Sequence, residues 1–166
     1  IFFNTYASNI NVSQRKSASL LDRWIVSKLN GLIQETTQKL DDYDITGAGR
    51  KIENFVINDL SLWHIRRSRR RFQKPENKKE LAEASKTLGV ILLTLSRLAA
   101  PFIPFLSETI FRCLRPDVKH SSVHLENWPE ADKKLIDKKL EGKMEEVRRI
   151  VNLALAERAK VAIKVR

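Results

Sequence analysis

Long segments of this chain carry apolar residues at steps of three and four, the spacing of a helix with one buried face. Only five glycines and five prolines interrupt its 166 residues. Leucine, lysine, glutamate, alanine and arginine are abundant, and these residue types favour helix over strand. The sequence therefore predicts an all-α fold: a helical bundle, followed by an irregular crossing and a long C-terminal helix.

Caps and breaks divide the pattern into five expected helices. They cover about residues 18–41, 45–73, 77–100, 104–114 and 132–162. Asp44 or Thr46 should cap the second helix, because a short polar side chain there accepts a backbone hydrogen bond. Pro104 should open the fourth helix, where a missing N–H is tolerated. The second helix is apolar on nearly all sides in its first half, so we expect it to be the central and most buried one.

We expect three parts along the chain. Residues 1–17 are a remnant of the connection from a preceding domain, residues 18–116 form the bundle, and residues 117–166 form the crossing segment and the C-terminal helix. The chain opens on Ile1 rather than on an initiating methionine, and we interpret it as part of a longer protein. Trp128 in the crossing segment is expected to plug the bundle.

The charge balance restricts the possible partners. A net charge of +11 and a pI near 10 indicate a polyanion, with nucleic acid as the first candidate and an anionic membrane surface as the second. No apolar run approaches the roughly 20 residues of a membrane span. Cys113 is the single cysteine, and His120 and His124 have no third ligand near them in sequence, so we predict no metal site.

The charge is most concentrated at residues 66–71, where five arginines directly follow an aromatic, apolar run. Planar guanidinium groups on a rigid helix suit phosphate recognition. The candidate phosphate-binding residues are Arg66, Arg67, Arg69, Arg70, Arg71 and Lys74. The alternative interpretation is a solvated, inert helix end.

Helical phase suggests that these arginines are not equivalent. At about 100° per residue, Arg66 and Arg70 continue the apolar face that surrounds Asp59. We therefore expect Arg66 to form a structural ion pair with Asp59. Arg67 and Arg71 lie to one side of that face and Arg69 lies to the other, so these three are expected to reach outward.

The sequence offers little for catalysis. The scattered glycines form no phosphate-binding loop. Ser61 and His64 lie about one helical turn apart, but two residues on one helix do not make a catalytic triad. We expect no catalytic residues in this chain.

Residues 59–72 resemble the signature helix of isoleucyl-tRNA synthetases. Five other segments match that family in the expected order: residues 22–25, 43–46, 99–106, 122–132 and 156–160. The corner at residues 99–106 also fits the valyl, leucyl and methionyl relatives, whereas the arginine helix and the crossing segment favour isoleucine. The chain departs from the family pattern near its start, where the leading helix is truncated at residues 2–6 and the loop at residues 8–19 matches no family motif. It also departs at His64, where the family often has tyrosine.

The resemblance implies an anticodon-binding helical bundle of a class I aminoacyl-tRNA synthetase, with the tRNA anticodon arm as its partner. The parent enzyme would couple ATP, isoleucine and tRNA in the cytoplasm. ATP with Mg²⁺ would belong to a catalytic domain outside this chain, so no cofactor is expected here. The chain is expected to act as a monomer that binds neither DNA nor membrane. Two rival functions stay open, a helical scaffold that does not bind RNA and an independent DNA-binding module.

Overall fold

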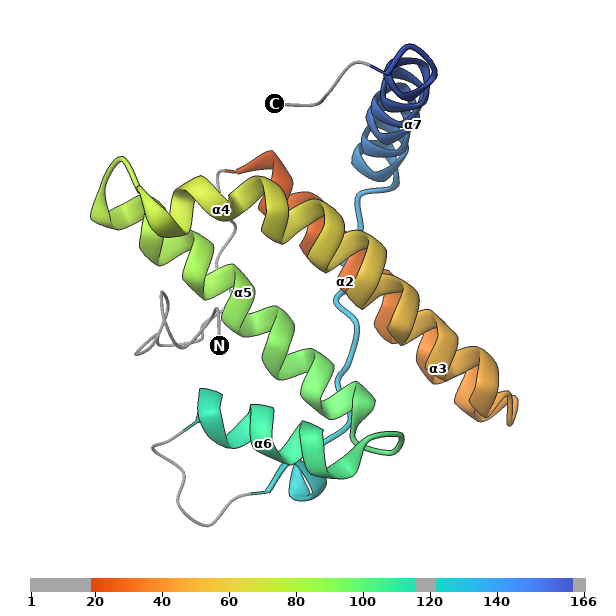
Figure 1. Cartoon of the computed structure of the whole chain (residues 1–166). Coiled ribbons are helices and arrows are strands. Elements are labelled where there is room, and N and C mark those ends of the chain that lie inside the picture. The colour runs from red at the N-terminus through yellow and green to blue at the C-terminus, as the bar shows by residue number, and fades with distance from the viewer. Residues whose placement is uncertain (1–18, 116–121, 163–166) are drawn as a thin grey trace. The chain divides into compact units, whose positions relative to one another are not determined.

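The computed structural model describes residues 19–115 and 122–162, and every regular element in these ranges is a helix (Figure 1). The elements are α2 (Leu20–Asp41), α3 (Ile45–Asn54), η1 (Phe55–Ile65), α4 (Arg66–Gln73), α5 (Lys78–Ala99), α6 (Pro104–Leu114), η2 (Val123–Leu125), η3 (Lys133–Leu135) and α7 (Lys138–Lys160). The predicted all-α fold is confirmed. The connection predicted at residues 1–17 and the candidate ligand His120 lie outside the described residues.

The helix starts follow from local chemistry. Asp44 caps α3, because its side chain accepts a hydrogen bond of 2.8 Å from the backbone N–H of Gly47. Asn77 caps α5 in the same way through the N–H of Glu80. Pro104 is the first residue of α6, as predicted. These signals act over a few residues, so the sequence alone places them well.

The predicted second helix is a continuous rod made of α3, η1 and α4. The backbone keeps right-handed helical angles at both junctions, Phe55 and Arg66. The middle segment, η1, is π-helical, so its hydrogen bonds run from residue i to residue i+5 instead of i+4. Each turn therefore contains more residues than in an α-helix. Faces assigned at 100° per residue drift as the chain passes through η1.

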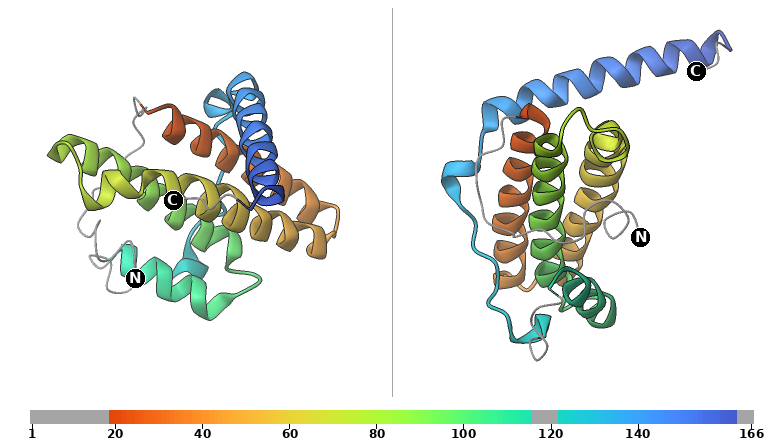
Figure 2. Two further views of the ribbon diagram at one scale, coloured as in Figure 1. Left: turned by 45° about the horizontal axis from the view of Figure 1, so that its top comes forward. Right: turned by 90° about the vertical axis from the view of Figure 1, so that its left-hand side faces the viewer.

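Three rods lie side by side in the bundle: α2, α5 and the α3–α4 rod (Figure 2). The largest fully buried apolar side chains of the long helices come from α2 and α5: Trp24, Ile25, Leu88, Ile91 and Leu98. The rod contributes buried residues such as Phe55, Leu60 and Trp63. It is not the most buried helix, contrary to expectation, because Ile57 and Leu62 are 46% and 53% exposed.

A smaller core joins α5 to α6 and to the crossing segment. Leu93, Phe111 and Val123 are buried together there. The Glu108 carboxylate binds this segment from α6, since it accepts hydrogen bonds from the Ser122 hydroxyl and from the Val123 N–H at 2.9 and 2.8 Å. Arg112, one turn along α6, donates to the same carboxylate at 2.6 Å.

The rest of the crossing segment is tied to α2. The indole N–H of Trp128 donates to the Thr37 hydroxyl at 2.9 Å, and the N–H of Asp132 donates to Asn30 at 2.8 Å. Trp128 is half-buried, so it lies against α2 and does not plug the bundle. The segment thus gives backbone and side-chain donors to polar groups on α2.

The chain divides into two compact units, one ending at Ile136 and the other beginning at Asp137. The second unit contains α7, which Asp137 caps and which has no buried residue. Helix α7 starts six residues later than predicted, because a short 3₁₀ turn at Lys133–Leu135 comes first. Among the described residues, we find no helix with both the length and the apolar character that a bilayer span needs.

Candidate nucleic-acid interface

The arginine helix α4 presents a solvent-facing side and a core-facing side. Ser68 and Phe72 are buried, and Arg71 is half-buried beside them. Arg66, Arg67, Arg69 and Arg70 are exposed. At about 100° per residue these four arginines occupy one continuous arc of roughly 160°. We call this arc the arginine surface.

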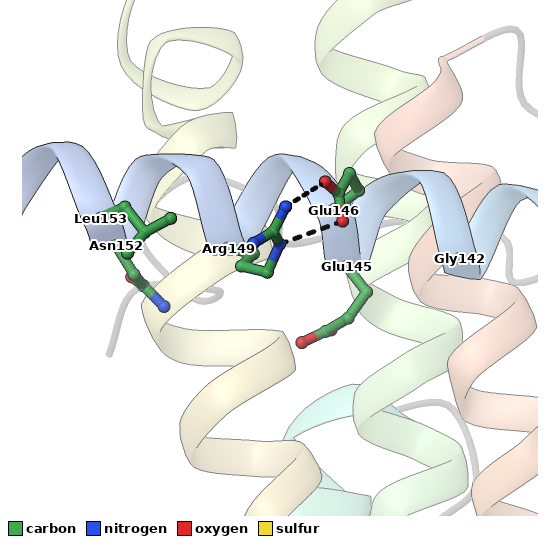
Figure 3. A pocket seen from close by; sticks show the side chains of 6 residues that line it. All are labelled: Gly142, Glu145, Glu146, Arg149, Asn152 and Leu153. Atoms are coloured by element: carbon green, nitrogen blue, oxygen red, sulfur yellow. Dashed lines mark hydrogen bonds and ion pairs between the residues drawn. The ribbon is translucent and has the colours of Figure 1, made fainter.

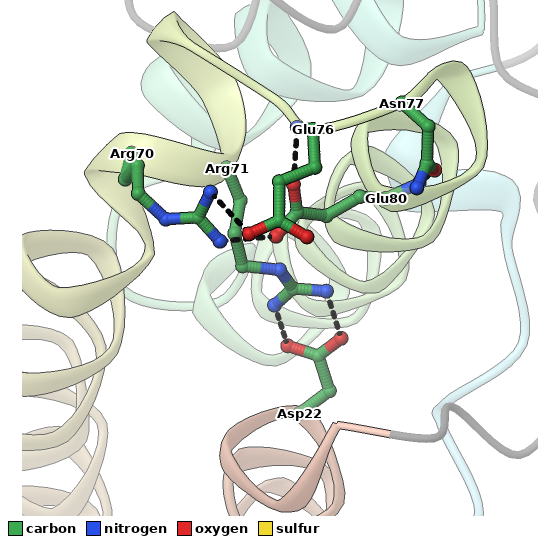
Figure 4. A network of polar contacts seen from close by, with 6 residues as sticks. All are labelled: Asp22, Arg70, Arg71, Glu76, Asn77 and Glu80. Atoms are coloured by element: carbon green, nitrogen blue, oxygen red, sulfur yellow. Dashed lines mark hydrogen bonds and ion pairs between the residues drawn. The ribbon is translucent and has the colours of Figure 1, made fainter.

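Arg71 is anchored inward, contrary to the prediction that it reaches solvent. Its guanidinium donates two hydrogen bonds to the carboxylate of Asp22 on α2, at 2.6 and 2.9 Å (Figure 4). The side chains of Arg71 and Asp22 are 12% and 0% exposed. The hydrogen bonds to Asp22 raise the pKa of Arg71, although burial acts in the opposite direction. This fork geometry fastens the end of the arginine helix to α2.

His64 belongs to the same buried cluster. Its Nε2 lies 3.2 Å from Oδ1 of Asp22, and its ring is fully buried. Because a carboxylate only accepts, a hydrogen bond between the two groups requires the proton to be on Nε2, and Nδ1 has no hydrogen-bond partner among the described residues. Asp22 therefore joins two consecutive segments, η1 and α4, to α2.

This cluster could not be predicted from the sequence pattern, because His64 and Arg71 lie 42 and 49 residues from Asp22 along the chain. One signal was available. Asp22 shares a helical face with Ile25 and Leu29, at steps of three and seven. A carboxylate on an apolar face is almost never fully buried unless it is paired. That rule predicts a partner for Asp22 but cannot say which cation provides it.

Arg70 was predicted to lie with the core, and this prediction is wrong. Its side chain forms a solvent-exposed network instead. Its guanidinium lies 3.0 Å from the Glu76 carboxylate and 2.7 Å from that of Glu80 (Figure 4). Glu80 also accepts a hydrogen bond of 2.8 Å from the Glu76 N–H, which closes the turn between α4 and α5. The side chain of Arg70 is 55% exposed, so solvent screens these pairs strongly.

The predicted ion pair between Asp59 and Arg66 is wrong. Oδ2 of Asp59 lies 3.5 Å from Nζ of Lys28 on α2, whereas Arg66 is exposed. The π-helical segment explains the error. Seven residues complete about two turns of an α-helix but fewer turns of a helix with i→i+5 bonding, so Arg66 leaves the Asp59 face.

The remaining basic side chains face solvent. Within the described residues, Arg66, Arg69 and Lys74 are exposed and form no ion pair. Arg67 is also exposed, and its guanidinium carbon lies 3.2 Å from the ring centroid of Trp63. Cations near the last turn of α4 also complement the negative end of the helix dipole. Of the three arginines predicted to reach outward, Arg71 is bound to Asp22, whereas Arg67 and Arg69 are exposed.

Helix α7 carries a second candidate surface, which is shallow (Figure 3). It is lined by Gly142, Glu145, Glu146, Arg149, Asn152 and Leu153, all from one helix. Arg149 donates to Glu146 at 2.6 and 3.2 Å, and this pairing lowers the pKa of Glu146 and raises that of Arg149. Mixed charges on a single helix give neither an enclosure nor a field that attracts phosphate. We therefore assign no site there.

The helical bundle and its basic helix match a known class of domain. Residues 22–166 match the family described as the anticodon-binding domain of tRNA ligase. Because this match covers most of the chain, the protein belongs to that family.

Three relatives are isoleucine–tRNA ligases from Thermus thermophilus, Dehalococcoides mccartyi and Thermococcus kodakarensis, which are 44%, 44% and 43% identical to the chain. The matches cover 88%, 99% and 87% of this chain. They cover only 14%, 17% and 14% of the relatives' own lengths. The chain therefore corresponds to a small part of those enzymes.

Proposed function

We propose that this chain binds the anticodon arm of an isoleucine tRNA and positions that tRNA for aminoacylation by an isoleucine–tRNA ligase. The family match and the named relatives support the class of partner. The single observation that carries the location is the arginine surface, a continuous exposed arc of four guanidinium groups on one rigid helix. Lys74, directly after α4, extends the positive charge.

The contacts are to the RNA backbone. An A-form stem hides its base edges in a deep, narrow groove, so it is recognised mainly through phosphates and shape. Arg66 and Arg69 have no internal ion pair in the described residues, so they can turn toward phosphates without breaking one. Arg70 first exchanges its contacts with Glu76 and Glu80, and Arg71 stays with Asp22 and contributes no phosphate contact.

The parent protein supplies the chemistry in this proposal. It couples ATP, isoleucine and tRNA, with ATP and Mg²⁺ held by parts of the protein other than the residues described above. We propose that it works in the cytoplasm as a monomer and that it uses neither DNA nor a membrane as a partner. The activity of the relatives, isoleucine–tRNA ligation, supports this assignment.

The test is a titration of an anticodon stem-loop hairpin against the chain and two charge-reversed variants. Arg69→Glu changes the arginine surface, and Arg50→Glu makes the same charge change at an exposed position of α3 in the same rod. We expect Arg69→Glu to weaken binding at least tenfold, and Arg50→Glu to weaken it by less than threefold. Equal losses for the two variants would mean that the proposed surface is not the one that binds RNA.

A further inference from the structure

Arg67 differs from the other arginines of the arginine surface in what lies beneath it. Its guanidinium carbon is 3.2 Å from the ring centroid of Trp63, one turn earlier in the rod. Trp63 is 7% exposed, so its indole is fixed in the core, whereas Arg67 is exposed. The guanidinium carbon therefore lies over the face of a buried indole, while the Arg67 side chain as a whole is exposed.

This arrangement orients the guanidinium. A cation over a tryptophan face is attracted by the ring quadrupole, and tryptophan is the strongest aromatic partner for this contact. The guanidinium is planar, so stacking fixes the direction in which its outer face points. Arg66 and Arg69 have no such support in the described residues, and their planes can turn to follow a phosphate.

We propose that Arg67, supported by Trp63, is a stacking platform for an unpaired base of the tRNA anticodon loop. The inference rests on the proposed function. Proteins that bind single-stranded RNA segments stack splayed bases on aromatic rings and on guanidinium planes. The platform accepts any base, because every base has a flat π face, and so it contributes affinity and register but little sequence discrimination.

The neighbouring charges agree with this role. Arg66, Arg69 and Arg70 lie on the same exposed arc as Arg67, so phosphates that flank a stacked base meet cations along α4. The site thus combines a flat stacking surface with positive charge around it.

The experiment compares Arg67→Lys with the matched control Arg69→Lys. Lysine keeps the positive charge but has no plane, so it preserves a phosphate contact and removes a stack. Affinity is measured for three RNAs: the intact anticodon hairpin, the same hairpin with abasic loop nucleotides, and a duplex of the stem alone. Thermal unfolding of each variant checks that the fold is retained.

We expect Arg67→Lys to lose about tenfold in affinity for the intact hairpin, the size of one lost stacked base. It should lose less than twofold on the abasic hairpin and on the duplex, and Arg69→Lys should lose less than twofold on all three RNAs. A second variant, Trp63→Phe, keeps an aromatic plane and should fall between the wild type and Arg67→Lys on the intact hairpin.

Two results would overturn the inference while RNA binding by this surface stands. One is an Arg67→Lys variant with wild-type affinity for the intact hairpin, and the other is an equal loss on the intact and abasic hairpins. If the wild-type chain binds none of the three RNAs, the proposed function and the stacking platform fail together.

Discussion

Arg69 and Arg71 lie two residues apart on one helix, and the structure gives them opposite roles. Arg71 is 12% exposed and bound to a fully buried carboxylate, whereas Arg69 is exposed and forms no ion pair among the described residues. The two side chains have identical chemistry. Their difference comes from helical phase, because Arg71 lies on the buried side of α4 with Ser68 and Phe72, whereas Arg69 lies on the exposed side. A cluster of arginines is therefore not a uniform basic patch. One member can hold the helix in place while its neighbours remain accessible.

The largest expected effect comes from breaking the buried side of this comparison. Asp22→Ala should lower the free energy of unfolding by about 3 kcal/mol, because it leaves the Arg71 cation and the His64 ring near the core without their carboxylate. Arg69→Ala should change it by less than about 0.5 kcal/mol, as is usual for an exposed side chain. Urea unfolding followed by circular dichroism measures both. Equal free energies of unfolding for the two variants would contradict the role of Asp22 as the anchor of α4.

A more exposed anchor sharpens the comparison. Glu108 holds the crossing segment, and its pKa is lowered from 4.5 to about 2, chiefly by the hydrogen bond from Arg112 and then by that from the Val123 N–H. A folded-state pKa below the unfolded value adds stability that is complete above pH 4.5 and is lost as the pH falls toward 2. In the Glu108→Gln variant, the free energy of unfolding should therefore depend less on pH between pH 4.5 and about 2. Unchanged pH dependence in the variant would contradict the assignment.

The smallest expected effect concerns Arg70, which lies between the two extremes. It is 55% exposed and paired, so Arg70→Gln should cost less than about 1 kcal/mol of stability. In the RNA titration, Glu76→Gln should strengthen hairpin binding slightly, by less than about threefold, because it removes one competing carboxylate from Arg70. Weaker hairpin binding by Glu76→Gln would show that the pairing with Glu76 assists RNA binding.

The sequence predicted the parts of this molecule that depend on local chemistry. Helix α6 was expected at about residues 104–114 and is found at Pro104–Leu114, because proline and the residues around it determine a helix start within one turn. The cap at Asp44 is found for the same reason. The family resemblance is also confirmed, since it rests on motifs distributed over most of the chain.

The roles of the individual arginines could not be predicted in this way. Their positions around the helix were predicted relative to Asp59, on the assumption of an α-helix. The segment between Asp59 and the arginines is π-helical, and residue helix propensities do not predict a π-helix. The partner of Arg71 is 49 residues away on another helix, so only the packed bundle shows it. Whether Arg66, Arg67, Arg69, Arg70 and Lys74 contact RNA stays a prediction.

The central claim is that Arg71 is an anchor and that Arg69 is a phosphate contact. The most direct test is the salt dependence of hairpin affinity for Arg69→Gln and for the double variant Asp22→Asn/Arg71→Gln. The double variant removes both members of the buried pair, so no buried charge is left unpaired. We predict that Arg69→Gln reduces the slope of log K against log salt by about 0.7 to 0.9 and that the double variant keeps the wild-type slope. A wild-type slope for Arg69→Gln together with a reduced slope for the double variant would contradict the account.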